Sequence, residues 1–294
     1  MINDAFQPFR MPLLMFLSGM LLHRGLAKSN KAFLLGKFAK IFWPFLLWSV
    51  IIYAAEGRMT LEFILKTPIS APSLLWYLWF LSAYYVMSLA LDRWSIPILP
   101  VIVVAIAASS VLPDLLRMSR FAYLLSFFLL GHLVATRNLS MEGRVLFGLA
   151  GLTCALTGAI ISILQGNVLY DPRFVWVPLG MIAFVLWAAP RCNGGALWRS
   201  IEWVGRNSIV FYVSHFPIQL LVARHAQDLG IANVNSVLAA VLLVSLCGGA
   251  LLQVVRTRYA IFAALFDLSK SRDILGALSK THLGKSLRLR NEAR

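Results

Sequence analysis

Charge is scarce in this sequence, and so is cysteine. Only 13% of its 294 residues are charged, whereas a soluble domain carries about 25%. Cys154, Cys192 and Cys247 are too scattered for a disulfide framework or a zinc site, so we expect three free thiols and no bound metal. Internal repeats and nucleotide-binding glycine fingerprints are absent as well. This composition argues against a protein whose main solvent is water.

Hydrophobic residues make up 60% of the chain and gather in runs separated by short polar breaks. Each run is close to the roughly 17 to 25 residues that cross a bilayer as a helix, the conformation that lipid requires because it offers the backbone no hydrogen-bond partners. We therefore predict an all-α fold, a polytopic membrane helix bundle in residues 1–255 with about nine transmembrane helices, followed by a basic tail in residues 256–294. The expected spans are Ala5–Leu22, Phe38–Ala55, Leu74–Leu91, Ile96–Leu112, Phe121–Ala135, Val145–Leu164, Phe174–Ala189, Ile209–Ala223 and Val237–Val255.

The basic residues indicate the orientation in the membrane. The formal net charge is +15, but Lys and Arg gather in the gaps between apolar runs, which predicts a topology signal and no nucleic-acid partner. Alternate gaps and the tail together hold 20 of the 27 basic residues, so we expect them in the cytoplasm and Met1 outside. One more helix before Met1 would return the N-terminus to the cytoplasm. Within the tail, Ile274–Leu289 is expected either to lie on anionic headgroups or to be disordered.

Two positions in the first apolar run are candidate functional residues. Arg10 lies at or near membrane depth, where a guanidinium group is unfavourable unless it is paired or lines a wet cavity. It is therefore either a functional residue or a side chain that extends to the outer headgroups. Ser18, which precedes Gly19, indicates either close packing between helices or a position in a cavity wall.

A polar stripe runs along the apolar segment near residue 215. Ser208, Tyr212, His215 and Gln219 recur at helical spacing, and a stripe of this kind faces protein or water rather than lipid. Three roles remain open for it: a hydrogen-bonded seam between helices, a substrate contact, or a catalytic base at His215. The other histidines fall at interfaces, in loops or in the tail, where we expect solvated roles: His23, His132, His225 and His282.

Aromatic residues open the third apolar run. Trp76 and Trp79 lie at its outer end, where amphipathic rings commonly anchor a helix at the headgroup level. The same rings could instead form a surface on which sugar rings stack. In another outer loop, Asp171-Pro172-Arg173 indicates a turn with a local ion pair.

Four motifs occur in a consistent order along the chain. The first reads Phe9-Arg10-Met11-Pro12-Leu13 and continues to Phe16-Leu17-Ser18-Gly19; the second follows Lys37 and Lys40 and reads Phe42-Trp43-Pro44-Phe45-Leu46-Leu47-Trp48-Ser49. The third is Leu75-Trp76-Tyr77-Leu78-Trp79-Phe80-Leu81, and the fourth is Val204-Gly205-Arg206-Asn207-Ser208-Ile209 with Tyr212 and His215. Together they resemble the membrane-bound acyltransferase 3 family from about Asn3 to Val255.

The resemblance implies an O-acyltransferase with about ten helices. Its members move an acyl group, usually acetyl, from a cytosolic donor such as acetyl-CoA, a co-substrate, to a hydroxyl of a carbohydrate or other envelope molecule in the inner or plasma membrane. The family's first helix carries an Arg and the His regarded as catalytic. The first run of this chain resembles the family's second helix, so the resemblance places that catalytic His upstream of Met1.

The basic cluster after the first run is a candidate site for the acyl-CoA donor. Lys37 and Lys40 occupy the places of a common Arg-x-x-Arg pair in the family, and Arg24 lies in the same expected cytoplasmic loop. Positive-inside topology or anionic lipid would explain the cluster equally well. No bound cofactor is expected beyond the co-substrate.

Two other classes of function are consistent with the sequence. A transporter or flippase of a sugar or lipid-linked substrate would use the polar stripe and the helices interrupted at Pro178 and Pro217. Against it, we find no inverted repeat and no acidic residue at mid-membrane depth. A catalytically inactive scaffold is the third reading.

Overall fold

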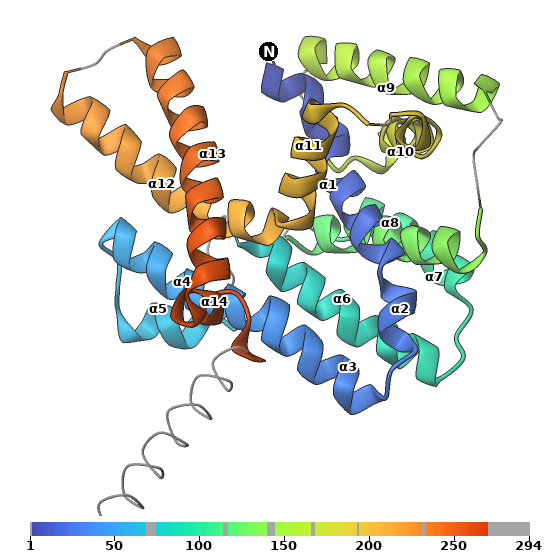
Figure 1. Ribbon diagram of the computed structural model, residues 1–294. Coiled ribbons are helices and arrows are strands. Elements are labelled where there is room, and N and C mark those ends of the chain that lie inside the picture. Colours follow the sequence, from blue (N-terminus) through green and yellow to red (C-terminus); the bar gives the residue numbers. More distant parts are fainter. Residues whose placement is uncertain are drawn as a thin grey trace, which may run out of the picture. The chain divides into compact units, whose positions relative to one another are not determined.

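The computed structural model describes residues 2–68, 75–113, 117–139, 145–165, 168–192, 194–230 and 233–269 (Figure 1). Every regular element within these ranges is a helix. The expected tail segment Ile274–Leu289 and His282 lie outside the described residues. The α-helices are α1 Ile2–Met20, α2 Leu22–Leu26, α3 Asn30–Lys37, α4 Trp43–Glu56, α5 Leu61–Lys66, α6 Trp76–Arg93, α7 Ile98–Val111, α8 Met118–Thr136, α9 Val145–Gln165, α10 Trp176–Ala188, α11 Ala196–Arg206, α12 Ser208–Asp228, α13 Val234–Arg258 and α14 Ala260–Ala264.

All nine expected spans overlap helices, which confirms an all-α membrane bundle. Among the described residues, six helical stretches are long and apolar enough to cross a membrane. At the other three expected spans, α7 is shorter, and α6 and α12 are less apolar because they carry polar and aromatic residues. The six stretches are Asp4–Leu26, Asn30–Glu56, Met118–Thr136, Val145–Leu164, Pro172–Arg191 and Asn235–Arg258.

The chain forms two compact units, which are described separately. Unit 1 comprises Met1–Leu34 and Ala83–Trp198, and unit 2 comprises Leu35–Ser82 and Arg199–Arg294. The three cysteines are free, as expected.

In unit 1, α1 packs against α8, α9 and α10, and α8 packs against α7. Two glycines allow the backbones of α1 and α8 to touch. A Cβ atom at Gly19 would lie 1.8 Å from the carbonyl oxygen of Phe128, and one at Gly131 would lie 2.0 Å from that of Phe16. Small residues permit such close crossings between membrane helices. The expectation that Ser18-Gly19 belongs to a packing patch is met at Gly19.

In unit 2, α12 and α13 form a helical hairpin, and α12 also packs on α4 (Figure 1). Side chains from three of the four motifs share one core there. Trp48 of the second motif and Leu78 of the third are buried in it, and Ile209 of the fourth motif packs against it. Phe266, which follows α14, is buried in the same core, so the beginning of the expected tail packs with the helices.

A π-helical turn, Phe38–Phe42, precedes α4. The backbone N–H of Trp43 donates to the carbonyl of Phe38, and Pro44 follows as one of the first residues of α4. Because proline has no N–H group, the normal helical bonding pattern cannot continue through Pro44, and a wider turn accommodates the change. Lys40 lies in this turn, and its side chain is exposed.

Candidate functional site

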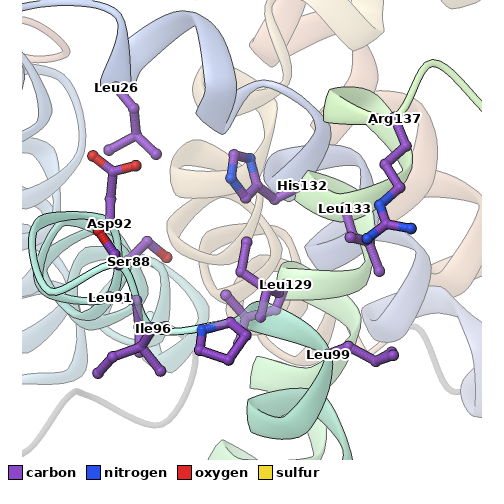
Figure 2. A pocket seen from close by; sticks show the side chains of 13 residues that line it. Leu26, Ser88, Leu91, Asp92, Ile96, Leu99, Leu129, His132, Leu133 and Arg137 are labelled. Carbon is purple, nitrogen blue, oxygen red and sulfur yellow. The ribbon is translucent and has the colours of Figure 1, made fainter.

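A cavity of about 390 Å³ opens in unit 1 among α6, α7 and α8 (Figure 2). We call it the Ser88–His132 cavity, after the two polar side chains that are most deeply buried in its lining. Ser88 and Asp92 come from α6, whereas His132 comes from α8 and Arg137 from the residue that follows α8. Most of the remaining wall is aliphatic, including Leu91, Leu129 and Leu133.

Helical spacing places these side chains on one face of each helix. Ser88, Leu91 and Asp92 are separated by three and four positions along α6. Leu129, His132 and Leu133 follow the same spacing along α8. Residues at these separations lie above one another on the helix surface, so the two faces can enclose one space.

Polar groups in the cavity differ in depth. Ser88 is 4% exposed and His132 is 7% exposed, whereas Asp92 and Arg137 are exposed at the mouth. Within the described part of the chain, neither the hydroxyl of Ser88 nor Nδ1 of His132 has a hydrogen-bond partner. Buried polar groups in folded proteins are normally paired, so two unpaired groups in one cavity favour a polar ligand or water there.

The expected solvated role of His132 is wrong. The sequence suggests an interfacial position because His132 is close to the end of an apolar run and to Arg137. The residue instead lies one turn inside the end of α8, next to Gly131, where α1 crosses closely. Close packing of α1 at Gly131 removes His132 from bulk solvent, which no single-helix pattern reveals.

A second cavity, of about 590 Å³, lies near the same end of α8. Arg24 and His23 line it together with residues Val134 and Asn138. Nδ1 of His23, in α2, lies 2.9 Å from the carbonyl oxygen of Met20, the last residue of α1, so the end of α1 engages this ring nitrogen. The structure thus places Arg24, an expected donor-binding residue, at an exposed rim in unit 1.

Tyr170 marks a basic cluster that includes Arg10. The guanidinium carbon of Arg120 lies 4.6 Å from the centre of the Tyr170 ring, a cation–π contact. Burial raises the pKa of Tyr170, while the positive charges of Arg120, Arg10 and Arg117 act in the opposite direction. The charges of three guanidinium groups thus act on the Tyr170 phenol. Arg10 itself is exposed.

The neighbouring turn contains the ion pair expected from the sequence. Asp171 accepts hydrogen bonds from Nε and Nη2 of Arg173, the latter at 2.6 Å, and also from the Arg173 backbone N–H at 2.9 Å. These hydrogen bonds hold the pKa of the Asp171 carboxyl below its usual range. This pair is local and structural.

In unit 2, the third and fourth motifs meet at two tyrosines. The ring centroids of Tyr77 and Tyr212 are 5.3 Å apart. Tyr212 also lies 5.8 Å from the ring of His215, whose Nδ1 is 2.5 Å from the Tyr212 carbonyl oxygen. The His215 ring is therefore hydrogen-bonded to the backbone of its own helix. His215 is half-buried, and Ser208 at the start of the stripe is exposed.

The tryptophans of the third motif have packing partners. Trp76 is nearly buried and packs on Phe80, with ring centroids 5.2 Å apart. Trp79 donates its indole N–H to the carbonyl oxygen of Pro68 at 2.9 Å. These contacts are consistent with anchoring of α6 and leave part of the Trp79 ring accessible.

The remaining expected site residues are divided between the two units. Ser18 donates its hydroxyl to the Leu14 carbonyl oxygen at 2.9 Å, so α1 itself engages this group. Lys37 and Lys40 belong to unit 2, whereas Arg24 belongs to unit 1. Across the residues that the structure describes, no group of three or more His, Cys, Asp or Glu side chains could hold a metal ion.

Comparison with known proteins places the chain in a functional context. A family model described as an acyltransferase domain, that of the acyltransferase 3 family, matches residues 1–254. No curated protein and no solved structure matches the chain. All four motifs fall within the matched residues.

Proposed function

Because this chain belongs to the acyltransferase 3 family, we propose that it is an integral membrane O-acyltransferase acting on an extracytoplasmic carbohydrate or other envelope molecule. The acyl group, acetyl in the simplest case, comes from acyl-CoA on the cytosolic side. The main support for this proposal is that the family model matches residues 1–254 of a chain with helices long and apolar enough to span a membrane. The proposed location is the inner or plasma membrane, with the C-terminus in the cytoplasm.

The reaction joins a hydroxyl oxygen to a thioester carbonyl carbon. The hydroxyl proton passes to a base, and negative charge develops on the carbonyl oxygen. The carbon–sulfur bond then breaks, and the base returns the proton to the leaving sulfur, which departs as the thiol of coenzyme A. A fixed positive group near the developing oxyanion lowers the barrier to this step. In unit 1, the basic cluster of Arg10, Arg117 and Arg120 around Tyr170 supplies such a field, and we assign Arg10 the role of stabilising negative charge.

Geometry within unit 1 supports reactants arriving from opposite sides. Arg10 of α1 and Arg120 of α8 both act on Tyr170, and the two helices cross again at Gly19 and Gly131. The helices therefore run in the same direction. On the topology predicted from charge, the Arg10 end is external and the Ser88–His132 cavity is near the cytosolic end.

Basic residues near the proposed cytosolic face would attract the phosphates of the donor. Arg24 is exposed in unit 1. In unit 2, Lys37 is the last residue of α3, and Lys40 is exposed on the π-helical turn that follows it. Lysine binds phosphate as a point charge and not through a planar fork. The proposed contribution of each lysine is therefore modest and sensitive to ionic strength.

Acceptor contact is proposed for the aromatic and polar groups of unit 2. Trp76 and Trp79 at the start of α6, with Ser208, Tyr212 and His215 on α12, combine ring faces with hydrogen-bonding groups. Carbohydrates bind through this combination of stacking and directed hydrogen bonds. The Tyr77–Tyr212 contact supports the proposal because it brings the two helices together.

The test is acyl transfer by the full chain in proteoliposomes. Acetyl-CoA labelled on its acetyl group is supplied on one side, with extracted envelope carbohydrate as the acceptor on the other. Label on acceptor hydroxyls supports the proposal, and removal of the label by mild base identifies an ester. Acceptor that crosses the membrane unmodified would instead indicate a transporter and overturn the proposal.

A matched pair of arginine variants sharpens the test. Arg10→Gln removes the proposed positive charge and should lower the transfer rate about 100-fold or more, as for loss of an oxyanion donor. Arg173→Gln removes an exposed guanidinium that forms a local pair with Asp171 and should leave the rate unchanged. Equal rates in the two variants would exclude a catalytic role for Arg10.

A further inference from the structure

The Ser88–His132 cavity contains polar groups that the proposed chemistry at Arg10 does not use. The hydroxyl of Ser88 and Nδ1 of His132 lack hydrogen-bond partners within the described residues. Both side chains are more than nine-tenths buried, and both line the same space. In Figure 2 Ser88 lies on α6 and the His132 ring enters from α8. Two helices thus direct unpaired groups into one cavity, which is a property of a ligand site.

The rest of the lining restricts the ligand. Leu91, Leu129 and Leu133 make much of the wall aliphatic, so the buried part of a ligand must be largely uncharged. At the mouth, exposed Arg137 and Asp92 place both signs of charge near the opening. Arg137 can bind an anionic group that stays outside, because guanidinium pairs with phosphate. The volume of about 390 Å³ suits a narrow small-molecule segment.

The arm of coenzyme A has this combination of properties. Pantetheine is a thin neutral chain in which amide groups alternate with short hydrocarbon segments, and it ends in the sulfur atom that carries the acyl group. Its amide groups can both donate to and accept from Ser88 and His132, while the phosphates of the nucleotide end remain outside near Arg137. We propose that the Ser88–His132 cavity binds the acyl-carrying pantetheine arm of the donor, an inference that rests on the proposed function.

Other ligand classes fit these groups less well. A hydrocarbon chain of a lipid would fill the aliphatic part but leave the buried hydroxyl and imidazole unpaired. A free nucleotide would bring phosphate or a polar base against Leu91, Leu129 and Leu133. Only a chain with polar groups spaced along an apolar body satisfies both the wall and the two buried polar atoms.

Calorimetric titration of the full chain in lipid nanodiscs with coenzyme A tests this proposal. Coenzyme A carries no acyl group, so binding is measured without turnover. Ser88→Ala and His132→Gln should each weaken binding about fivefold to tenfold, because each removes or displaces one hydrogen bond. Ser88→Leu, which fills the cavity, should weaken binding further and abolish competition by free pantetheine.

Two controls separate loss of the site from loss of the fold. Ser126→Ala removes another buried hydroxyl of α8, one that donates to the Tyr123 carbonyl oxygen at 2.6 Å, and should bind coenzyme A as the unmodified chain does. Size-exclusion profiles and thermal midpoints in detergent should match across all variants that are compared. Arg137→Ala should weaken the binding of coenzyme A and of adenosine 3′,5′-bisphosphate. The ability of free pantetheine to compete with coenzyme A should stay unchanged.

The outcomes distinguish this inference from the proposed function. Acyl transfer by the unmodified chain, with normal coenzyme A binding by folded Ser88→Leu and His132→Gln variants, would overturn the cavity assignment and leave the function standing. Cavity-dependent binding of coenzyme A without any acyl transfer would support the assignment and count against the function. No binding of coenzyme A or pantetheine to the unmodified chain would overturn the assignment.

Discussion

Tyr77 on α6 and Tyr212 on α12 contact each other with ring centroids 5.3 Å apart and ring planes inclined at 58°. The contact joins the third and fourth motifs, which are far apart in the sequence. Aromatic pairs of this geometry contribute about 0.5–1.5 kcal/mol beyond the area that they bury. The pair therefore helps to hold α6 and α12 together within unit 2, where the proposed acceptor contacts lie.

A double-mutant cycle should detect this contact. Tyr77→Leu and Tyr212→Leu are each expected to reduce the free energy of unfolding, and the double variant should lose less than the two single losses combined. The expected coupling is about 0.5–1.5 kcal/mol, measured by SDS titration of the detergent-solubilised protein. Additive effects would show that the two rings stabilise the fold independently.

Alanine at Gly19 should destabilise unit 1 strongly. Its Cβ atom would lie 1.8 Å from the Phe128 carbonyl oxygen, and this neighbour is backbone and cannot rotate away. Separating α1 from α8 should cost about 1–3 kcal/mol or more, read from the same SDS titration. Gly131→Ala should behave alike, because its Cβ would meet the Phe16 carbonyl oxygen at 2.0 Å.

The matched control for these glycines is Gly36, the second-last residue of α3, which lies inside the longer helical stretch Asn30–Glu56. A Cβ atom there would meet no other atom within 4 Å. Gly36→Ala should therefore stabilise the chain by about 0.5–1 kcal/mol, since alanine loses less backbone entropy in a helix. A similar loss of stability in Gly19→Ala and Gly36→Ala would refute the close crossing of α1 and α8.

Acid should weaken the turn at Asp171. Hydrogen bonds from Arg173 lower the pKa of this carboxyl in the folded state, so its contribution is complete above the pKa of the unfolded chain. That contribution is lost as the pH falls through the lowered, folded-state pKa. The thermal midpoint of the unmodified chain should fall over this acidic range, whereas the Asp171→Asn variant should lack this component.

The effect at Asp171 is expected to be small, because the Arg173 side chain is 82% exposed and water screens the pair. Arg173→Gln provides a second comparison, since it removes the partner but keeps the carboxylate. Should Asp171→Asn and the unmodified chain lose thermal stability in parallel as the pH falls, another group must be responsible.

Thiol labelling tests the predicted topology. Cys192 is exposed, and it lies in a gap assigned to the cytoplasm from the distribution of basic residues. A membrane-impermeant maleimide should therefore label it in inside-out vesicles and not in intact cells. Cys247 is exposed on the candidate span Asn235–Arg258, where hydrocarbon disfavours the reactive thiolate, so it should react slowly from both sides.

A cysteine introduced at an expected external position completes this experiment. Arg173→Cys in a background without the natural thiols should react in intact cells. Reaction of Cys192 in intact cells, together with protection of the introduced cysteine, would reverse the predicted orientation.

Local patterns in the sequence account for much of the fold. Apolar runs of bilayer length predict helices because a backbone in lipid must satisfy its own hydrogen bonds, and each of the nine runs overlaps a helix. The pair Asp171–Arg173 is also predictable from the sequence, because its partners are only two positions apart. These features depend on neighbours along the chain.

Candidate site residues show the limit of such patterns. Arg10 and Ser18 are recognisable as unusual residues in an apolar run, but the sequence does not reveal that Arg10 shares a basic cluster with Arg120. His215 stands out in a polar stripe, yet its ring nitrogen is bonded to the backbone of its own helix. A stripe shows which face is polar and leaves its partner undetermined.

The amino-acid order alone establishes an all-helical membrane chain, its motifs and its family, because bilayer length, residue type and spacing are properties of contiguous segments. Only packing in three dimensions creates the Ser88–His132 cavity, since its buried groups come from different helices and α1 shields His132 by crossing at Gly131. The burial of a polar group depends on which helix covers it, and that contact is made between residues distant in the chain.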